Sequence, residues 1–229
     1  MLFLALDTST ERLIVGLRST DPQRTDRWTN LDSQGNHARD LLPVTEDLLE
    51  GQVPDVVGIT LGPGSFTGVR IGLATAKGLA EGWKVPLVGI DNLAAMADGW
   101  RRLVPGSPAA VLPVIDARKK KFYGLLSDEN HTLVEPSDLS PDAWIAAVAA
   151  VWQGPVVVSG YQGALLVEAL GTGLPQGWSV LPLHDWAPGL LDQTERAWID
   201  GTFLSADAGP RYLRLSEAEE NLRSRSVAG

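Results

Sequence analysis

The sequence lacks cysteine altogether and has few histidines, and both shortages remove classes of chemistry. Without cysteine, the 229-residue chain has no disulfide, no thiolate metal site and no cysteine nucleophile. The three histidines, His37, His131 and His184, are far apart and form no HxxxH or HExxH pair. A metal site carried on one helix is therefore excluded. The lack of cysteine also fits a reducing compartment.

Positive charge and long apolar runs are scarce as well. The formal net charge is −9, so the chain repels nucleic acid unless its few cations cluster. The only basic run is "ARKKKFY" (117–123), which by default is a solvated turn. The N-terminal apolar run is too short for a signal peptide, and no other run is long enough to span a bilayer. We therefore expect a cytoplasmic protein with no membrane association.

Short apolar strands and helical patterns alternate through the first half of the chain. The expected strands cover 2–7, 12–18, 27–32, 55–61 and 86–90, and the expected helices cover 37–51, 67–82 and 91–103. Asp91 is placed to cap the third helix. Pro43 should kink the first helix or mark its true first turn.

The second half begins like the first. The expected strands cover 109–116, 121–128, 155–160 and 178–183, and the expected helices cover 141–153, 163–170 and 190–201. In both halves a strand ends in aspartate (Asp7, Asp116), and after a polar turn a strand with an internal glycine returns (Gly16, Gly124). This predicts an α/β fold made of duplicated mixed-sheet units, although two unrelated hairpins ending in aspartate would give the same pattern.

Proline and glycine cluster between the two units. The stretch "RRLVPGSP" (101–108) predicts a boundary there. We therefore expect an N-terminal lobe over 1–103 and a smaller C-terminal lobe over 104–229.

Two lobes with an aspartate at each hairpin are typical of actin-like and sugar-kinase ATPases. In such a site a glycine lets phosphate approach the backbone, because a Cβ would block it. Neither turn, 7–10 or 116–119, contains glycine. Asp7 is therefore either a remnant of a ligand set or a residue that caps the hairpin, and a catalytic phosphate site is disfavoured.

The segment "GPGSFTGVR" (62–70) has the composition of a phosphate loop but not the spacing. Its glycines at 62, 64 and 68 fit neither the Walker nor the Rossmann pattern. An anion at the helix start is one interpretation. A sharp strand-to-helix turn with a serine or threonine cap is the other, and we favour it.

The helix after this turn carries two rows of small residues. One row is Gly68, Gly72, Ala76 and Ala80, and the other is Ala74, Gly78 and Gly82. Each interior glycine costs about 0.5–1 kcal/mol relative to alanine, so something should approach closely. One row suffices for packing on the chain's own sheet; two rows favour a second contact, with another chain. Arg70, in the first turn, opposes the helix dipole and needs a partner.

Several motifs resemble one protein family. The strings "LALDTST", "GPGSFTGVRIGLATAKGLA", "GIDNLAAMA", "VIDARKKKFY" and "PRYLR" occur in order from residue 1 to about 215. "NHARDLLP" (36–43) is similar to the start of a helix in the same family. Together these strings resemble the TsaB (YeaZ) family.

The resemblance implies a two-lobed actin-like ATPase (RNase H-like) fold with a degenerate nucleotide site. It implies a non-catalytic subunit that joins TsaD and the ATPase TsaE to make threonylcarbamoyladenosine beside the anticodon of tRNAs that read codons starting with A. The chain alone would form a homodimer through the surface that binds TsaD, and it would meet tRNA only through the complex. No cofactor is required, although ATP or ADP at the partner interface fits the resemblance.

The resemblance also assigns residues. The helices over 37–50 and 67–82 would form the partner interface. Its residues would be His37, Leu41, Thr45, Leu48, Val69, Arg70, Gly72, Leu73, Ala76 and Ala80. A vestigial nucleotide site would comprise Asp7, Thr8 and Asp116, with no metal ligand and no catalytic residue. The alternative is an ATP-dependent small-molecule kinase of the same fold. A protease is disfavoured, because the sequence offers no nucleophile–base pair.

Overall fold

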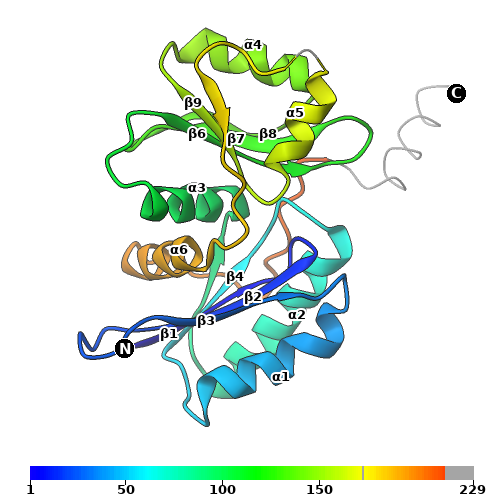
Figure 1. Ribbon diagram of the computed structural model, residues 1–229. Helices are drawn as coiled ribbons and strands as arrows, with labels where there is room; N and C mark the ends of the chain where they lie inside the picture. The colour runs from blue at the N-terminus through cyan, green and yellow to red at the C-terminus, as the bar shows by residue number, and fades with distance from the viewer. Residues whose placement is uncertain (172, 215–229) are drawn as a thin grey trace, which may run out of the picture.

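The computed structural model describes residues 1–171 and 173–214, which form two five-stranded mixed sheets (Figure 1). The first sheet contains β1 (Leu2–Asp7), β2 (Arg12–Ser19), β3 (Arg27–Asp32), β4 (Val56–Thr60) and β5 (Leu87–Ile90). The second contains β6 (Ala110–Asp116), β7 (Phe122–Ser127), β8 (Thr132–Leu139), β9 (Val156–Ser159) and β10 (Trp178–Val180). The helices are α1 (His37–Leu49), α2 (Phe66–Trp83), α3 (Asn92–Leu103), α4 (Pro141–Val151), α5 (Gly163–Leu170) and α6 (Ala187–Ile199).

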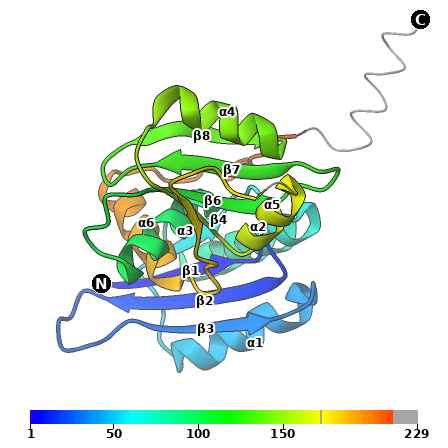
Figure 2. The same cartoon turned by 45° about the horizontal axis from the view of Figure 1, so that its top comes forward.

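Both sheets have the same topology, which confirms the predicted repeat of one unit. Their strand orders are β3-β2-β1-β4-β5 and β8-β7-β6-β9-β10. In each, three strands form an antiparallel meander and the other two run parallel to its first strand. Figure 2 shows β8, β7 and β6 above β1, β2 and β3. The sequence patterns missed β8, an edge strand that contains Pro136, because a proline inside a run argues against a strand.

The helices form three layers around the two sheets. Helices α1 and α2 cover the outer face of the first sheet, α4 and α5 cover that of the second, and α3 and α6 lie between the sheets (Figure 1). Helix α3 packs on the second sheet, whereas α6, from the other half of the chain, packs on the first. The division of the chain at residue 103 stays a prediction, because each half supplies one helix to the sheet of the other.

The helix ends agree with the expected caps. The Asp91 carboxylate accepts a hydrogen bond from Ala94 N at 3.1 Å at the start of α3. Ser65 Oγ accepts one from Gly68 N at 3.2 Å at the start of α2. Helix α1 begins at His37 and continues through Pro43, so the proline does not mark its first turn. Among the described residues, no helix combines the length and apolarity that crossing a bilayer requires.

The segment 203–214, which we call the strap, runs along the first lobe and reaches the second. Phe203 forms an antiparallel bridge with Val88, and Leu204 N donates to Leu87 O at 2.8 Å. Lys77 Nζ then holds the strap through two of its carbonyl oxygens, at 2.7 and 2.6 Å. The strap therefore covers the β5 edge of the first sheet.

The last residue of the strap belongs to the second lobe by its contacts. The Arg214 guanidinium donates to both carboxylate oxygens of Asp138, at 2.8 and 3.0 Å. It also donates to Ala117 O, at 2.8 Å, in the β6–β7 turn. The strap thus connects α2 and β5 of one lobe with β8 and the β6–β7 turn of the other.

Candidate functional site

The first small-residue row of α2 faces the chain's own interior. A Cβ at Gly68 would meet Thr8 O, and a Cβ at Gly72 would meet Thr8 Oγ1. Thr8 Oγ1 donates a hydrogen bond to Gly68 O at 2.8 Å. These two glycines therefore let the β1–β2 turn lie directly against the helix, and Ala76 and Ala80 continue the same buried row.

The second row faces outward. Ala74, Gly78 and Gly82 are exposed, and no described atom lies within 4 Å of a Cβ built at Gly78 or Gly82. Nothing in the described chain uses the close approach that these glycines allow. The two rows lie on different sides of α2, and only one is occupied by this chain.

Most residues of the predicted interface are buried within the chain. The buried members are His37, Leu41, Thr45, Val69, Gly72, Leu73, Ala76 and Ala80. Leu48 is half-buried and Arg70 is exposed. The helices that carry them, α1 and α2, lie side by side on one face of the first sheet (Figure 1). Their outward positions include Arg39, Leu42 and Glu46 on α1, and Thr67, Ala74 and Gly78 on α2. Whether this outer face binds a partner stays a prediction.

Arg70 has a counterpart within the chain. Its Nε donates to Tyr212 Oη at 2.8 Å, and its Cζ lies 3.8 Å from the centre of the Phe66 ring. The rings of Phe66 and Tyr212 stack with centroids 4.8 Å apart. The strap therefore supplies the polar partner that a cation in the first turn of a helix requires. Sequence reasoning had no means of pairing residues 142 positions apart.

Asp7 is buried with both carboxylate oxygens already bonded. Oδ1 accepts from Ser9 N, from Ser9 Oγ and from Thr60 Oγ1, at 2.8, 2.6 and 2.7 Å. Oδ2 accepts from Trp186 Nε1 at 2.7 Å. The carboxylate of Asp7 is thus a structural junction between the β1–β2 hairpin, β4 and the start of α6.

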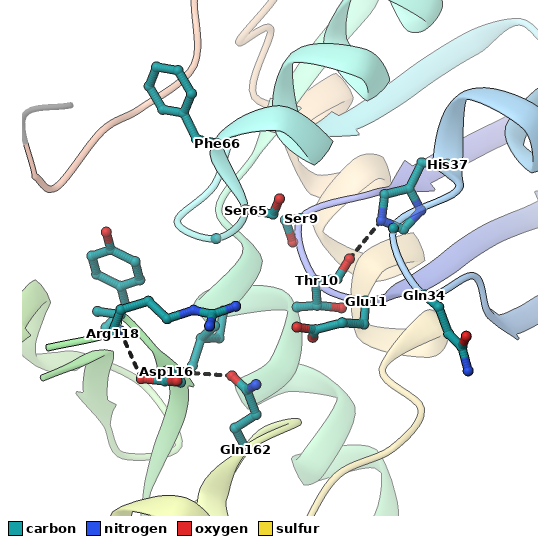
Figure 3. Close-up of a pocket in the computed structure, with 15 residues that line it drawn as sticks. Ser9, Thr10, Glu11, Gln34, His37, Ser65, Phe66, Asp116, Arg118 and Gln162 are labelled. Atoms are coloured by element: carbon teal, nitrogen blue, oxygen red, sulfur yellow. Dashed lines mark hydrogen bonds between the residues drawn. The ribbon is translucent and has the colours of Figure 1, made fainter. Parts of the chain in front are cut away.

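A cavity of about 460 Å³ lies between the lobes (Figure 3). It is lined by Ser9, Thr10, Glu11, Gln34, Gly35, His37, Gly64, Ser65, Phe66, Ile115, Asp116, Ala117, Arg118, Tyr123 and Gln162. Asp116 N donates to Gln162 Oε1 at 2.7 Å, and the ring Nε2 of His37 is 2.7 Å from Thr10 O. Figure 3 shows the Arg118 side chain reaching into the cavity from the β6–β7 turn. Of the predicted nucleotide residues, the cavity includes Asp116 but neither Asp7 nor Thr8.

The residues around Asp7 do not fit a metal-bound nucleotide. Both oxygens of the Asp7 carboxylate accept hydrogen bonds from the chain itself. Thr8 is packed against Gly68 and Gly72 of α2, and Ser9 lies against Gly64 in the turn before it. In the part of the chain that the structure describes, no group of three His, Cys, Asp or Glu side chains is placed to hold a metal ion.

The fold and the cavity define the structural class of the protein. Two copies of one mixed-sheet unit with a cavity between them make the chain a two-lobed protein of the actin-like, RNase H-like fold. A family model described as "TsaD: tRNA N6-adenosine threonylcarbamoyltransferase" matches residues 32–158, more than half of the chain. The chain belongs to the TsaB (YeaZ) family, within the wider group that this model describes.

Individual relatives agree with this assignment. The "tRNA threonylcarbamoyladenosine biosynthesis protein TsaB" of Escherichia coli is 36% identical over 132 residues, which are 54% of this chain and 53% of that protein. In that alignment the chain spans about half of the relative's length. The protein of the same name from Bacillus subtilis is 29% identical over 96% of both chains.

A solved structure extends the comparison to the fold. YeaZ from Pseudomonas aeruginosa superposes with a TM-score of 0.74 and 28% identity, over 93% of this chain and 99% of that one. This confirms the predicted fold over both lobes.

Proposed function

We propose that the chain is a non-catalytic subunit of the machinery that makes threonylcarbamoyladenosine in tRNA. It would bind the threonylcarbamoyltransferase TsaD through the outer face of α1 and α2. The names of its relatives support the pathway. The exposed row Ala74, Gly78 and Gly82 is the observation that carries the interface, because its glycines leave open a close approach that no described part of this chain uses.

The environment of Asp7 supports a subunit without chemistry of its own. In an ATPase of this fold an aspartate at the hairpin would organise metal and water, but here its oxygens accept bonds from Ser9, Thr60 and Trp186. A kinase reading would need that carboxylate to be available. The chain would therefore act through the surface it presents to its partner, and no nucleotide within it is required.

The resemblance supports three further parts of the proposal. The chain would associate with TsaE, it would form a homodimer through the α1–α2 face in the absence of TsaD, and it would act in the cytoplasm. A nucleotide held where the chain meets its partner also stays a prediction. The small exposed residues of α2 support a self-contact and a contact with TsaD equally, because both need close approach of two helices.

Two variants, each with arginine in place of an exposed alanine, test the interface. Ala74→Arg places a long charged side chain on the exposed row, whereas Ala146→Arg makes the same change on the exposed face of α4. We expect Ala74→Arg to weaken association with TsaD by about tenfold or more, since a small residue in a close helix contact tolerates no such volume. Size-exclusion co-elution and titration calorimetry measure the effect, and circular dichroism checks the fold.

Ala146→Arg is the control for a nonspecific effect of the added arginine. Ala146→Arg should leave co-elution unchanged. If Ala74→Arg associates with TsaD as well as the wild-type chain does, the α1–α2 face is not the interface.

A further inference from the structure

The β6–β7 turn carries the only basic run of the sequence in a strained backbone. Arg118, Lys119 and Lys120 have φ values of +65°, +55° and +58°. Such φ values are unfavourable for residues other than glycine, and residues that adopt them normally occur singly. Residues 8–10 of the equivalent β1–β2 turn have no positive φ. The fold can therefore make this hairpin without the strain.

The strained turn is held in place by defined contacts. Ala117 N donates to Lys121 O at 2.9 Å, and Lys121 N donates to Arg118 O at 3.1 Å. Arg118 N also donates to the Asp116 carboxylate at 2.8 Å. Residues 118–121 are all exposed. A fixed turn that displays successive cations to solvent is the result.

Exposed aromatic rings adjoin this turn. Phe66 and Arg118 line the same cavity, and Tyr212, stacked on Phe66, is 43% exposed while Phe66 is 38% exposed. Arg214 joins the strap to the turn through Ala117 O. We call the resulting area the basic–aromatic surface. It comprises Phe66, Arg70, Arg118, Lys120, Arg211 and Tyr212.

The basic–aromatic surface combines partly neutralised positive charge with aromatic rings. Asp138 pairs with Arg214 and lies 3.8 Å from Lys121, so part of the positive charge is neutralised. Arg118 reaches into the cavity, which Glu11 and Asp116 also line (Figure 3), and Arg211 is exposed beside Tyr212. Cations beside partly exposed rings suit RNA, because phosphates bind the cations and an unpaired base can stack on a ring such as that of Tyr212.

We propose that the basic–aromatic surface contacts the tRNA substrate directly, at an unpaired segment and its phosphates. The inference rests on the proposed function, since the tRNA is the substrate of that machinery. The inference goes beyond the proposed function, because the resemblance implies contact with tRNA only through the rest of the complex. An overall charge of −9 restricts such contact to this local cluster.

Binding of a labelled tRNA transcript to the assembled complex with TsaD tests the inference. We expect Lys120→Glu to weaken binding by about threefold to tenfold and to lower the slope of log K against log salt by about one. Lys84→Glu is the matched control, since Lys84 is also exposed and has a similar φ of +57°. It should leave the affinity unchanged. Tyr212→Ala should weaken binding by about tenfold if a base stacks on the ring.

Co-elution with TsaD separates this inference from the proposed function. Lys120→Glu should still form the complex. If the complex forms and its tRNA affinity is unchanged, the RNA contact is wrong and the proposed function stands. If Lys120→Glu instead abolishes co-elution, the turn binds protein, and the RNA inference is overturned. A wild-type chain that does not associate with TsaD contradicts the proposed function itself.

Discussion

At the scale of single residues, Asp7 forms hydrogen bonds within the chain that its place in the sequence did not reveal. Its carboxylate lies at the end of β1 and is buried under Trp186, which comes from the second half of the chain. A buried carboxylate is tolerated only when donors surround it. The indole N–H of Trp186 is one of those donors and also connects α6 to the first sheet.

Replacing Trp186 tests this role. Trp186→Phe keeps most of the buried ring but removes the donor to Asp7 Oδ2. We expect a loss of about 1–3 kcal/mol in the free energy of unfolding, because a buried acceptor oxygen loses its hydrogen-bond donor. Urea denaturation measures the change.

A surface pair provides the control. Trp28 Nε1 donates to Asp185 Oδ2 at the same distance, 2.7 Å, but at an exposed position. Trp28→Phe should cost about 0.5 kcal/mol or less, because water replaces the lost donor. Equal losses for the two variants would show that the Asp7 contact is not special.

At the scale of elements, α2 serves two surfaces with two rows of small residues. The row through Gly68 and Gly72 accommodates the β1–β2 turn, and the row through Gly78 faces solvent. Both rows consist of glycine and alanine at intervals of four residues. The physical consequences of filling them are opposite.

Two glycine-to-alanine changes measure that difference. Gly78→Ala should stabilise the chain by about 0.5–1 kcal/mol, because alanine is the better helix former and the Cβ meets no described atom. Gly72→Ala should destabilise it by about 1–3 kcal/mol, because the Cβ collides with Thr8 Oγ1. Thermal denaturation of both variants provides the comparison. If both changes stabilise the chain, the assignment of the rows to inner and outer faces is wrong.

At the scale of the whole molecule, exchanged helices and an ion network bind the two halves. Arg18 of β2 contacts Asp26, Asp192 and Glu195 at 2.6, 2.8 and 3.1 Å. Burial alone would lower the pKa of Arg18, but bonds to Asp26 and Asp192 outweigh it and raise that pKa. Burial alone would raise the pKa of Asp192, but Arg102 and Arg18 lower it below its usual value.

The lowered pKa of Asp192 predicts a dependence of stability on pH. An acid whose pKa is lowered by folding stabilises the chain above its unfolded pKa of about 4, and this stabilisation is lost as the pH falls through the folded pKa. Asp192→Asn should therefore cost roughly 2–4 kcal/mol at pH 7. The gap from the wild type should shrink as the pH falls below about 4. Urea denaturation of both proteins at pH 7 and at pH 3 measures this difference in stability.

The exposed Asp47 on α1 provides a reference for the substitution itself, since Asp47→Asn makes the same chemical change at the surface. A gap for Asp192→Asn that stays constant down to pH 3 would contradict the ionic origin of the stabilisation.

Much of the local structure follows from the sequence. The alternation of apolar runs predicts most strands, Asp91 predicts a cap that the structure confirms, Ser65 is the one of the expected serine or threonine residues that caps α2, and the recurring strand–aspartate–turn pattern predicts the repeated unit. The sequence does not predict strand β8, because Pro136 interrupts its strand pattern. These features depend on neighbouring residues, whose physical preferences can be read in order along the chain.

Only the tertiary structure decides which way each residue faces. The sequence by itself determines that α2 has two small-residue rows, that Arg70 needs a partner, and that Asp7 ends a buried strand. The structure decides that Thr8 occupies one row, that Tyr212 is the partner of Arg70, and that Trp186 bonds to Asp7. Each of these outcomes joins residues far apart in the chain, and such contacts form only when distant segments pack, so no local pattern encodes them.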